Sequence, residues 1–157
     1  MNDLIERAID AATGSGAAYA DVRIVEHQAE SLTVKNGSLA AASSERSAGF
    51  AVRVLVEGAW GFASSQDLGL DESQRVARQA VAIARASRLA GGPAVVLDDT
   101  APAAGHWGTP YVEDPFAVSF EDKLRILFEA DAAMASVPGV SVREGTVEAG
   151  RERKTFA

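Results

Sequence analysis

The sequence contains no cysteine, and this absence removes two kinds of site at once. Without a thiol, the chain forms neither a disulfide framework nor a thiolate metal site of its own. Histidine is almost as scarce, because the only two, His27 and His106, lie far apart in the sequence. A catalytic zinc site needs about three protein ligands, two of them often one helical turn apart. We therefore expect no metal ligand in this chain and interpret both histidines as ordinary strand and loop residues.

Motifs for nucleophilic catalysis and for phosphate binding are missing as well. No serine stands in a G-x-S-x-G turn, and Gly14-Ser15-Gly16 follows a predicted helix rather than a strand. The chain has no G-x-x-x-x-G-K-[ST] loop. Two acidic pairs, at 98–99 and 113–114, fall in predicted loops, where carboxylates are usually solvated. We expect no catalytic residue in this segment.

Positive charge is in short supply. The chain carries 15 Lys+Arg against 22 Asp+Glu, a formal net charge of -7. Because such a domain is repelled by a phosphate backbone, direct nucleic-acid binding is disfavoured. No apolar run approaches the roughly 20 residues of a membrane-spanning helix, and the N-terminus lacks the basic-then-apolar layout of a signal peptide. We expect a cytoplasmic protein with no membrane contact.

The hydrophobic content is that of a folded domain, at 47% of the residues. Apolar residues recur at helical spacing over 2–13 and 71–90, and a third helix is predicted to begin after Ser119 as its N-cap. Asp71 is the candidate N-cap of the second helix, with Gln74 three residues later. Leu124, Leu127, Phe128 and Met134 are expected on one side of the third helix.

Residues 20–64 change to a period of two. Short alternating stretches are separated by Asn36-Gly37 and Glu57-Gly58, which are turn signals because such residues tolerate positive φ. Residues 38–43 are the predicted returning strand of the first turn. The segment from 91 to 118 is expected to be extended, with a short strand at 94–97. A last hairpin, 140–148 and 151–156, is predicted to turn at Ala149-Gly150.

This order of elements predicts an α+β fold, in which an antiparallel β-sheet meander has helices packed mainly on one face. We interpret residues 1–157 as a single domain. The sequence stops inside an apparent strand, at Phe156 and Ala157, with no turn or polar tail after it. An open strand of this kind predicts that the chain is truncated.

Three aromatic residues form the candidate peptide or partner surface. Trp60 and Phe62 fall on the same face of one predicted strand, and Phe50 is expected to neighbour them across the hairpin. Such a cluster forms part of the core or, alternatively, lines a surface that holds an extended peptide or a protein partner.

Several stretches, taken in their order and spacing, resemble the N-terminal domain of the TldD/PmbA family. They are 19–23 (YADVR), 34–37 (VKNG), 49–56 (GFAVRVLV) and 58–63 (GAWGFA). Residues 114–116 (DPF) and 151–154 (RERK) resemble its TldD side in particular. The resemblance covers nearly the whole chain.

This resemblance implies a function that the residues alone do not. Members of the family are cytoplasmic zinc metallopeptidases or their non-catalytic partners, also called modulators of DNA gyrase, and they act in peptide maturation and antitoxin degradation. They act on unfolded or short peptides as homodimers or as TldD–PmbA-type heterodimers. Their zinc lies in a C-terminal domain on an H-E-x-x-x-H motif with a further ligand. No such motif occurs here, so the resemblance assigns this segment no cofactor and the role of a scaffold and substrate-access domain.

Two other functions stay open at this point. The chain could be a stand-alone, non-catalytic binding or adaptor module, which needs no catalytic residue. Within the family, it could belong to the PmbA-like, non-catalytic partner subunit. A nucleic-acid-binding domain is opposed by the net charge.

Overall fold

The computed structural model describes residues 2–99 and 101–157, and within them it has the predicted α+β architecture. The elements follow in the order α1 (Asn2–Gly14), β1 (Tyr19–Lys35), β2 (Ser38–Val56), β3 (Ala59–Ser65), α2 (Leu70–Leu89), β4 (Gly105–Gly108), α3 (Phe120–Ala135) and β5 (Glu144–Phe156). The strands form one sheet in the order β3-β2-β1-β5-β4. Each strand is antiparallel to its neighbours, and Val22 and Ala157 exchange both backbone hydrogen bonds where β1 meets β5.

Both predicted hairpin turns are confirmed. Asn36 and Gly37 have φ of 47° and 74°, and Glu57 and Gly58 have φ of 49° and 78°. Positive φ at both central residues defines a type I′ turn, whose twist matches that of the flanking strands. The second turn fixes the register of β2 and β3, with Val56 opposite Ala59.

The strands are longer than the alternation predicts. β1 and β2 run unbroken for 17 and 19 residues, because the small and polar residues at 38–47 continue β2 although they bury nothing. The predicted hairpin at Ala149-Gly150 is wrong, since β5 is one strand. Gly150 has no positive φ. β5 pairs with β1 in the sheet, and the Thr33 and Thr146 hydroxyls of the two strands lie 2.9 Å apart, so a neighbouring strand takes the place of the predicted hairpin partner.

Two further local predictions are wrong. Residues 94–97 form no strand; the strand of this segment is β4, paired with residues 153–156 of β5. Asp71 is not the N-cap of α2, because Gly69 occupies that position. The Asp67 carboxylate accepts the Gly69 N–H at 2.9 Å, so the turn ends and the helix begins two residues earlier. Ser119 does cap α3 and accepts the Asp122 N–H at 3.0 Å.

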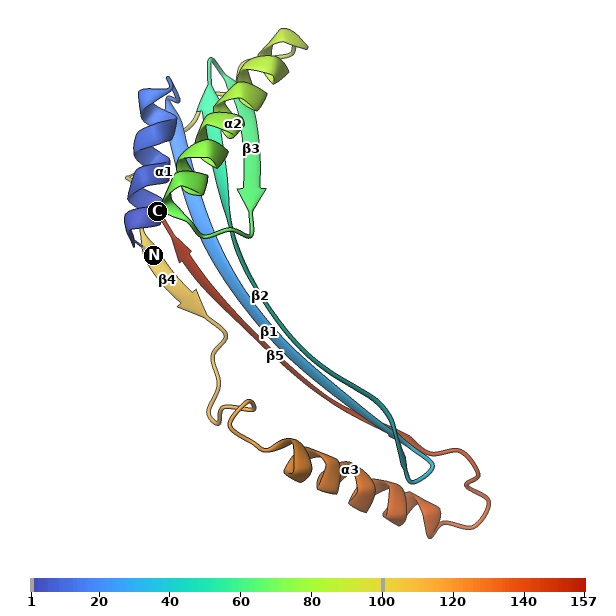
Figure 1. Ribbon diagram of the computed structural model, residues 1–157. Helices are drawn as coiled ribbons and strands as arrows, with labels where there is room; N and C mark the ends of the chain where they lie inside the picture. The colour runs from blue at the N-terminus through green and yellow to red at the C-terminus, as the bar shows by residue number, and fades with distance from the viewer. Residues whose placement is uncertain (1, 100) are drawn as a thin grey trace. The chain divides into compact units, whose positions relative to one another are not determined.

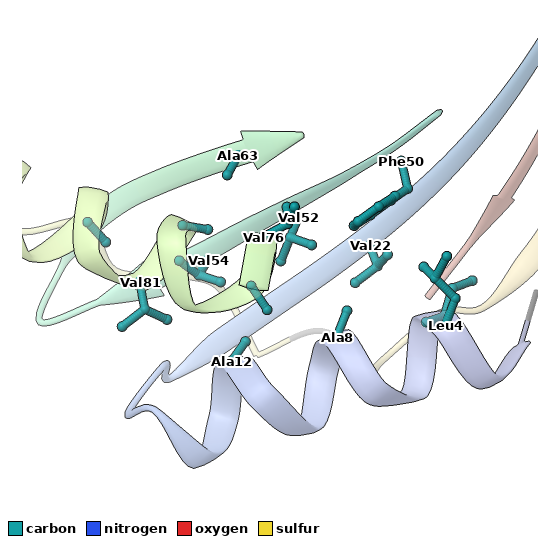
Figure 2. Packing of buried hydrophobic residues seen from close by; sticks show 14 of the residues in the cluster. Leu4, Ala8, Ala12, Val22, Phe50, Val52, Val54, Ala63, Val76 and Val81 are labelled. Atoms are coloured by element: carbon teal, nitrogen blue, oxygen red, sulfur yellow. The ribbon is translucent and has the colours of Figure 1, made fainter. Parts of the chain in front are cut away.

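The chain divides into two compact units, of which unit 1 comprises Met1–Glu26, Ser47–Gly108 and Arg153–Ala157. Its core lies between the sheet and two helices, α1 and α2, which cover the same face (Figure 1). Figure 2 shows residues from both helices pointing at the sheet residues; they are Leu4, Ala8, Ala12, Val76 and Val81 from the helices, and Val22, Phe50, Val52, Val54 and Ala63 from the sheet.

Small residues let α2 lie unusually close to β3. A Cβ atom placed on Gly61 would be 2.0 Å from the Ala80 carbonyl oxygen and 2.9 Å from the Ala84 Cβ. Gly61 is therefore required by the packing and not by its own backbone angles, since its φ is not positive. Ala77, Ala80 and Ala84 form the matching small-residue face of the helix and are all fully buried.

Unit 2 comprises His27–Arg46 and Thr109–Glu152, and its apolar core is much smaller. Leu127 of α3 packs against Leu32 and Val34 of β1. The predicted inner face of α3 is thus right for Leu124 and Leu127, which both pack in this core, but Phe128 is 38% exposed. Two charged residues, Lys123 and Asp131, take inward positions instead.

Those inward charges are paired. Lys123 donates to Glu30 of β1, and the Arg143 Nε lies 3.1 Å from an Asp131 carboxylate oxygen. A buried charge is tolerated only when it is paired and hydrogen-bonded. These ion pairs therefore add to the small apolar core: one joins α3 to β1, and the other joins α3 to the segment that precedes β5.

Candidate peptide-binding face of the sheet

The face of the unit 1 sheet opposite the helices collects the polar and aromatic residues of three strands. In β2, Val52 and Val54 point to the helices, so Arg53 and Leu55 point the other way. The β2–β3 register then places Phe62 opposite Arg53, and Trp60 opposite Leu55. We call this surface the open face; it consists of Tyr19, Asp21, Arg23, Ala51, Arg53, Leu55, Trp60 and Phe62.

A buried carboxylate organises the middle of the open face. Asp21, which is 9% exposed, accepts a hydrogen bond from the Arg53 Nε at 2.6 Å. The Arg23 Nε lies 3.3 Å from the other oxygen of the same carboxylate. The hydrogen bond with Asp21 raises the pKa of the Arg53 guanidinium above its usual value, with a smaller contribution from Tyr19. Two permanent cations therefore converge on one anion.

Aromatic rings hold Arg53 in place from its other side. Its guanidinium carbon lies 4.9 Å from the centre of the Trp60 ring, within the range of a cation–π contact. Tyr19 packs edge-on against Trp60, with ring centres 5.8 Å apart and planes at 86°. Leu55, which lies opposite Trp60 on the neighbouring strand, is only 6% exposed.

Two adjoining hollows open beside the arginines. The smaller, of about 120 Å³, is lined by Asp21, Arg23, Ala51, Arg53 and Phe62. The larger, of about 620 Å³, shares Arg23 and Ala51 with the first. Its remaining lining is Val25, Ser47, Ala48, Gly49, Phe50, Ser64, Ser65 and Gln66.

The structure brings two of the three predicted aromatic residues together and separates the third. Trp60 is half-buried and Phe62 is 57% exposed, both on the open face. Phe50 is 2% exposed, lies opposite Ser65, and belongs to the core beneath the helices. The expectation that Phe50 neighbours the other two is wrong. Phe62 pairs with Arg53, and Phe50 is three positions from Arg53 on the same strand. Because strand residues an odd number of positions apart face opposite sides of the sheet, Phe50 points to the helices.

Sequence reasoning missed the charged residues of the open face, Asp21, Arg23 and Arg53. A signal for Arg53 was present, because the turn at 57–58 places Arg53 opposite Phe62. The pairing of Asp21 with Arg53 had no such signal, since it depends on how β1 and β2 align far from their connecting turn.

The histidines are placed as ordinary residues. His27 is exposed on β1, as predicted. The prediction of a loop at His106 is wrong, because His106 lies in β4 opposite Thr155, and its Nδ1 is 3.0 Å from the Thr155 hydroxyl. Among residues 2–99 and 101–157, no three His, Cys, Asp or Glu side chains are grouped as metal ligands. Within the same residues, no helix has both the length and the apolar character that crossing a bilayer requires.

Comparison with known proteins identifies the domain. Residues 20–84, which run from β1 into α2 and include nearly all of the open face, match the profile of the PmbA/TldA metallopeptidase domain 1. These residues form a domain 1 of the PmbA/TldD family.

The relatives of this PmbA/TldD domain are much longer proteins. A metalloprotease of Methanothermobacter thermautotrophicus is 33% identical over 123 residues, which are 78% of this chain and 25% of that protein. A metalloprotease of Methanocaldococcus jannaschii is 28% identical over 111 residues, which are 71% of this chain and 25% of that protein. The chain thus spans about a quarter of the length of these relatives.

Solved structures show the same fold for nearly the whole chain. A modulator of DNA gyrase from Thermotoga maritima superimposes with a TM-score of 0.80 at 15% identity, covering 99% of this chain and 34% of that one. TldE from Thermococcus kodakarensis superimposes with a TM-score of 0.70 at 13% identity, covering 98% of this chain and 35% of that one. The α3-bearing unit 2 therefore belongs to the shared fold as well.

Proposed function

We propose that this chain is the N-terminal scaffold and substrate-access domain of a TldD-type zinc metallopeptidase that acts on unfolded or short peptides. The match of residues 20–84 to a metallopeptidase domain 1 carries this proposal. Relatives named metalloproteases, of which the chain spans a quarter, support it.

The described residues do not fit the zinc ion of such an enzyme. No donor set of three suitable side chains is grouped among them, so zinc would be held by residues outside this segment. The contribution of this domain is then to bind and orient the peptide, and we assign it no step of the hydrolysis.

An exposed stretch of β2 is suited to hold an extended peptide. β3 pairs only with residues 50–56, so residues 38–46 have β1 on one side and no described strand on the other. All of them are exposed, and most are serine or alanine. Backbone hydrogen bonds along such an edge bind an extended peptide largely independently of its sequence, and the small side chains leave space for the peptide.

The TldD-like side of the family is supported by one contact in unit 2. Arg151 donates to Asp114 at 2.8 Å, and its guanidinium lies 4.8 Å from the centre of the Phe116 ring. The two stretches that resembled TldD in the sequence therefore meet in space. By the same resemblance we propose a cytoplasmic homodimer or TldD–PmbA-type heterodimer, which native mass spectrometry of the complete protein would test.

The decisive experiment compares this chain with the product of its complete reading frame. We expect the complete protein, alone or mixed with its PmbA-like partner, to contain zinc by elemental analysis and to cleave unfolded peptides. A chelator should abolish the cleavage, and the 157-residue chain should be inactive. Peptide cleavage by the 157-residue chain that a chelator stops would contradict the proposal, and so would a complete protein that binds no zinc in either preparation.

Hydrogen exchange tests the peptide-binding edge. An extended, non-cleavable peptide should slow exchange within residues 38–46 of the complete protein. Because Lys35 and Ser38 flank the turn and pair with each other, the Ala41 N–H should point away from β1. Ala41→Pro should then abolish the protection, while Ala41→Val, which keeps the N–H, should preserve it. Equal protection in both variants would exclude this edge.

A further inference from the structure

We propose that the smaller hollow of the open face binds a carboxylate group of an extended peptide, between the guanidinium groups of Arg23 and Arg53. This proposal rests on the proposed function in one respect, that the ligand is a peptide. It assigns a recognition site, and thereby a substrate preference, to residues that carry no catalytic role.

The charges around this hollow do not balance. Arg23 and Arg53 each direct their Nε to Asp21, so two positive charges face a single negative one. Arg23 makes no further ion pair within the described residues, and its side chain is 58% exposed. A guanidinium has five N–H donors in a planar fork, which matches the two oxygens of a carboxylate. In a chain with a net charge of -7, this local excess of positive charge favours an anionic ligand.

The shape of the site fits a carboxylate with a chain attached to it. The hollow of about 120 Å³ admits a small polar group and has Phe62 and Ala51 as apolar walls. The adjoining hollow of about 620 Å³ lies within the usual size range of ligand sites, roughly 300–1,000 Å³. Ser64, Ser65 and Gln66 line it with groups that can bond a peptide backbone. A peptide could place its carboxylate at the arginines and its neighbouring residues in the larger hollow.

Asp21 has two opposing effects in this arrangement. Its buried carboxylate fixes the arginines in place, which lowers the entropy lost when a ligand binds. It also repels a second carboxylate. Asp21→Asn keeps the shape of the side chain while removing its charge, so it should strengthen carboxylate binding. If Asp21, Arg23 and Arg53 only stabilised the fold, Asp21→Asn would not increase the affinity for a carboxylate.

The test uses the 157-residue chain and records the NMR signals of its arginine Nε–H groups. An N-acetylated tetra-alanine with a free C-terminus should shift the Arg23 and Arg53 signals, with a dissociation constant in the millimolar range. The same peptide with an amidated C-terminus should not. An amidated peptide with one internal glutamate tests whether a side-chain carboxylate binds as well as a terminal one. Binding of either kind of carboxylate supports the site.

Variants tie the binding to the two arginines. Arg23→Gln should weaken binding about tenfold, the usual weight of a hydrogen bond to a charged group. Arg53→Gln should do the same, and its melting temperature shows whether the fold survives. Asp21→Asn should tighten binding about two- to fivefold. Arg7→Gln, at an exposed arginine of α1, is the matched control and should change nothing.

Three results would overturn the proposal. They are equal binding of the free-acid and amidated tetra-alanines, unchanged affinity in Arg23→Gln, and absence of binding by every carboxylate peptide. Failure of the peptidase assay on the complete protein would refute the proposed function but would leave these binding results as they stand. The two proposals can therefore fail independently.

Discussion

Replacing Gly61 with alanine should destabilise unit 1 more than a single methyl group would suggest. The added Cβ would lie 2.0 Å from the Ala80 carbonyl oxygen and 2.7 Å from the Ala84 nitrogen, both backbone atoms of α2. Ordinary contact begins near 3.4 Å. No side-chain rotation relieves these contacts, so the whole helix would have to move away from β3 by about 1.4 Å.

The size of the effect follows from two opposing terms. Overpacking of a well-packed core usually costs about 1–3 kcal/mol, and a clash with backbone belongs at the upper end of that range. Alanine also restricts the unfolded chain, which returns about 0.4–1 kcal/mol. We therefore expect Gly61→Ala to lower the free energy of unfolding by about 2–2.5 kcal/mol. For a chain of this length, this corresponds to a melting temperature roughly 4–10 °C lower.

Urea denaturation followed by tryptophan fluorescence measures this change, because Trp60 and Trp107 both lie in unit 1. Gly14→Ala is the matched control, since Gly14 also lies in unit 1, at the end of α1, lacks positive φ, and has open space where its Cβ would be. The control should change the stability by less than about 1 kcal/mol. If both variants unfold at the same urea concentration, the close packing of α2 on β3 is not as described.

Three further predictions concern other parts of the molecule. Lys123→Ala should cost about 1–3 kcal/mol and speed hydrogen exchange in α3, because it leaves the Glu30 carboxylate unpaired at a partly buried site; unchanged exchange would contradict this role. A hydrogen bond with Arg75 is the main cause that lowers the pKa of Glu72 to about 2 from 4.5. The charged Glu72 should therefore stabilise the folded chain above about pH 4.5 and lose this effect as the pH falls toward 2, and carboxyl NMR should show a higher pKa in Arg75→Gln. Phe62→Ser should alter stability by less than about 0.5 kcal/mol, because Phe62 is 57% exposed, yet weaken peptide binding measured by the same NMR titration; a large loss of stability would show that Phe62 belongs to the core.

Much of the fold could be predicted from local signals. Helical spacing located all three helices to within one or two residues, because each buries one continuous stripe. The two turns were predicted from Asn36-Gly37 and Glu57-Gly58, since few residues tolerate positive φ. The returning strand was predicted only as far as residue 43, because the exposed residues that follow carry no alternation.

The sequence by itself therefore determined the features that depend on residues close together along the chain, namely the helices, the turns and the alternation within each strand. Only the tertiary structure decided that residues 140–156 include one strand and no hairpin, because β1, more than a hundred positions away, is the hydrogen-bonded neighbour of that strand. It also decided that Phe50 lies beneath the helices while Trp60 meets Arg53 and, through it, Asp21. The alignment of paired strands determines which side chains come into contact. That alignment is selected by the burial of apolar side chains along a whole face of the sheet, which no short stretch of sequence reveals.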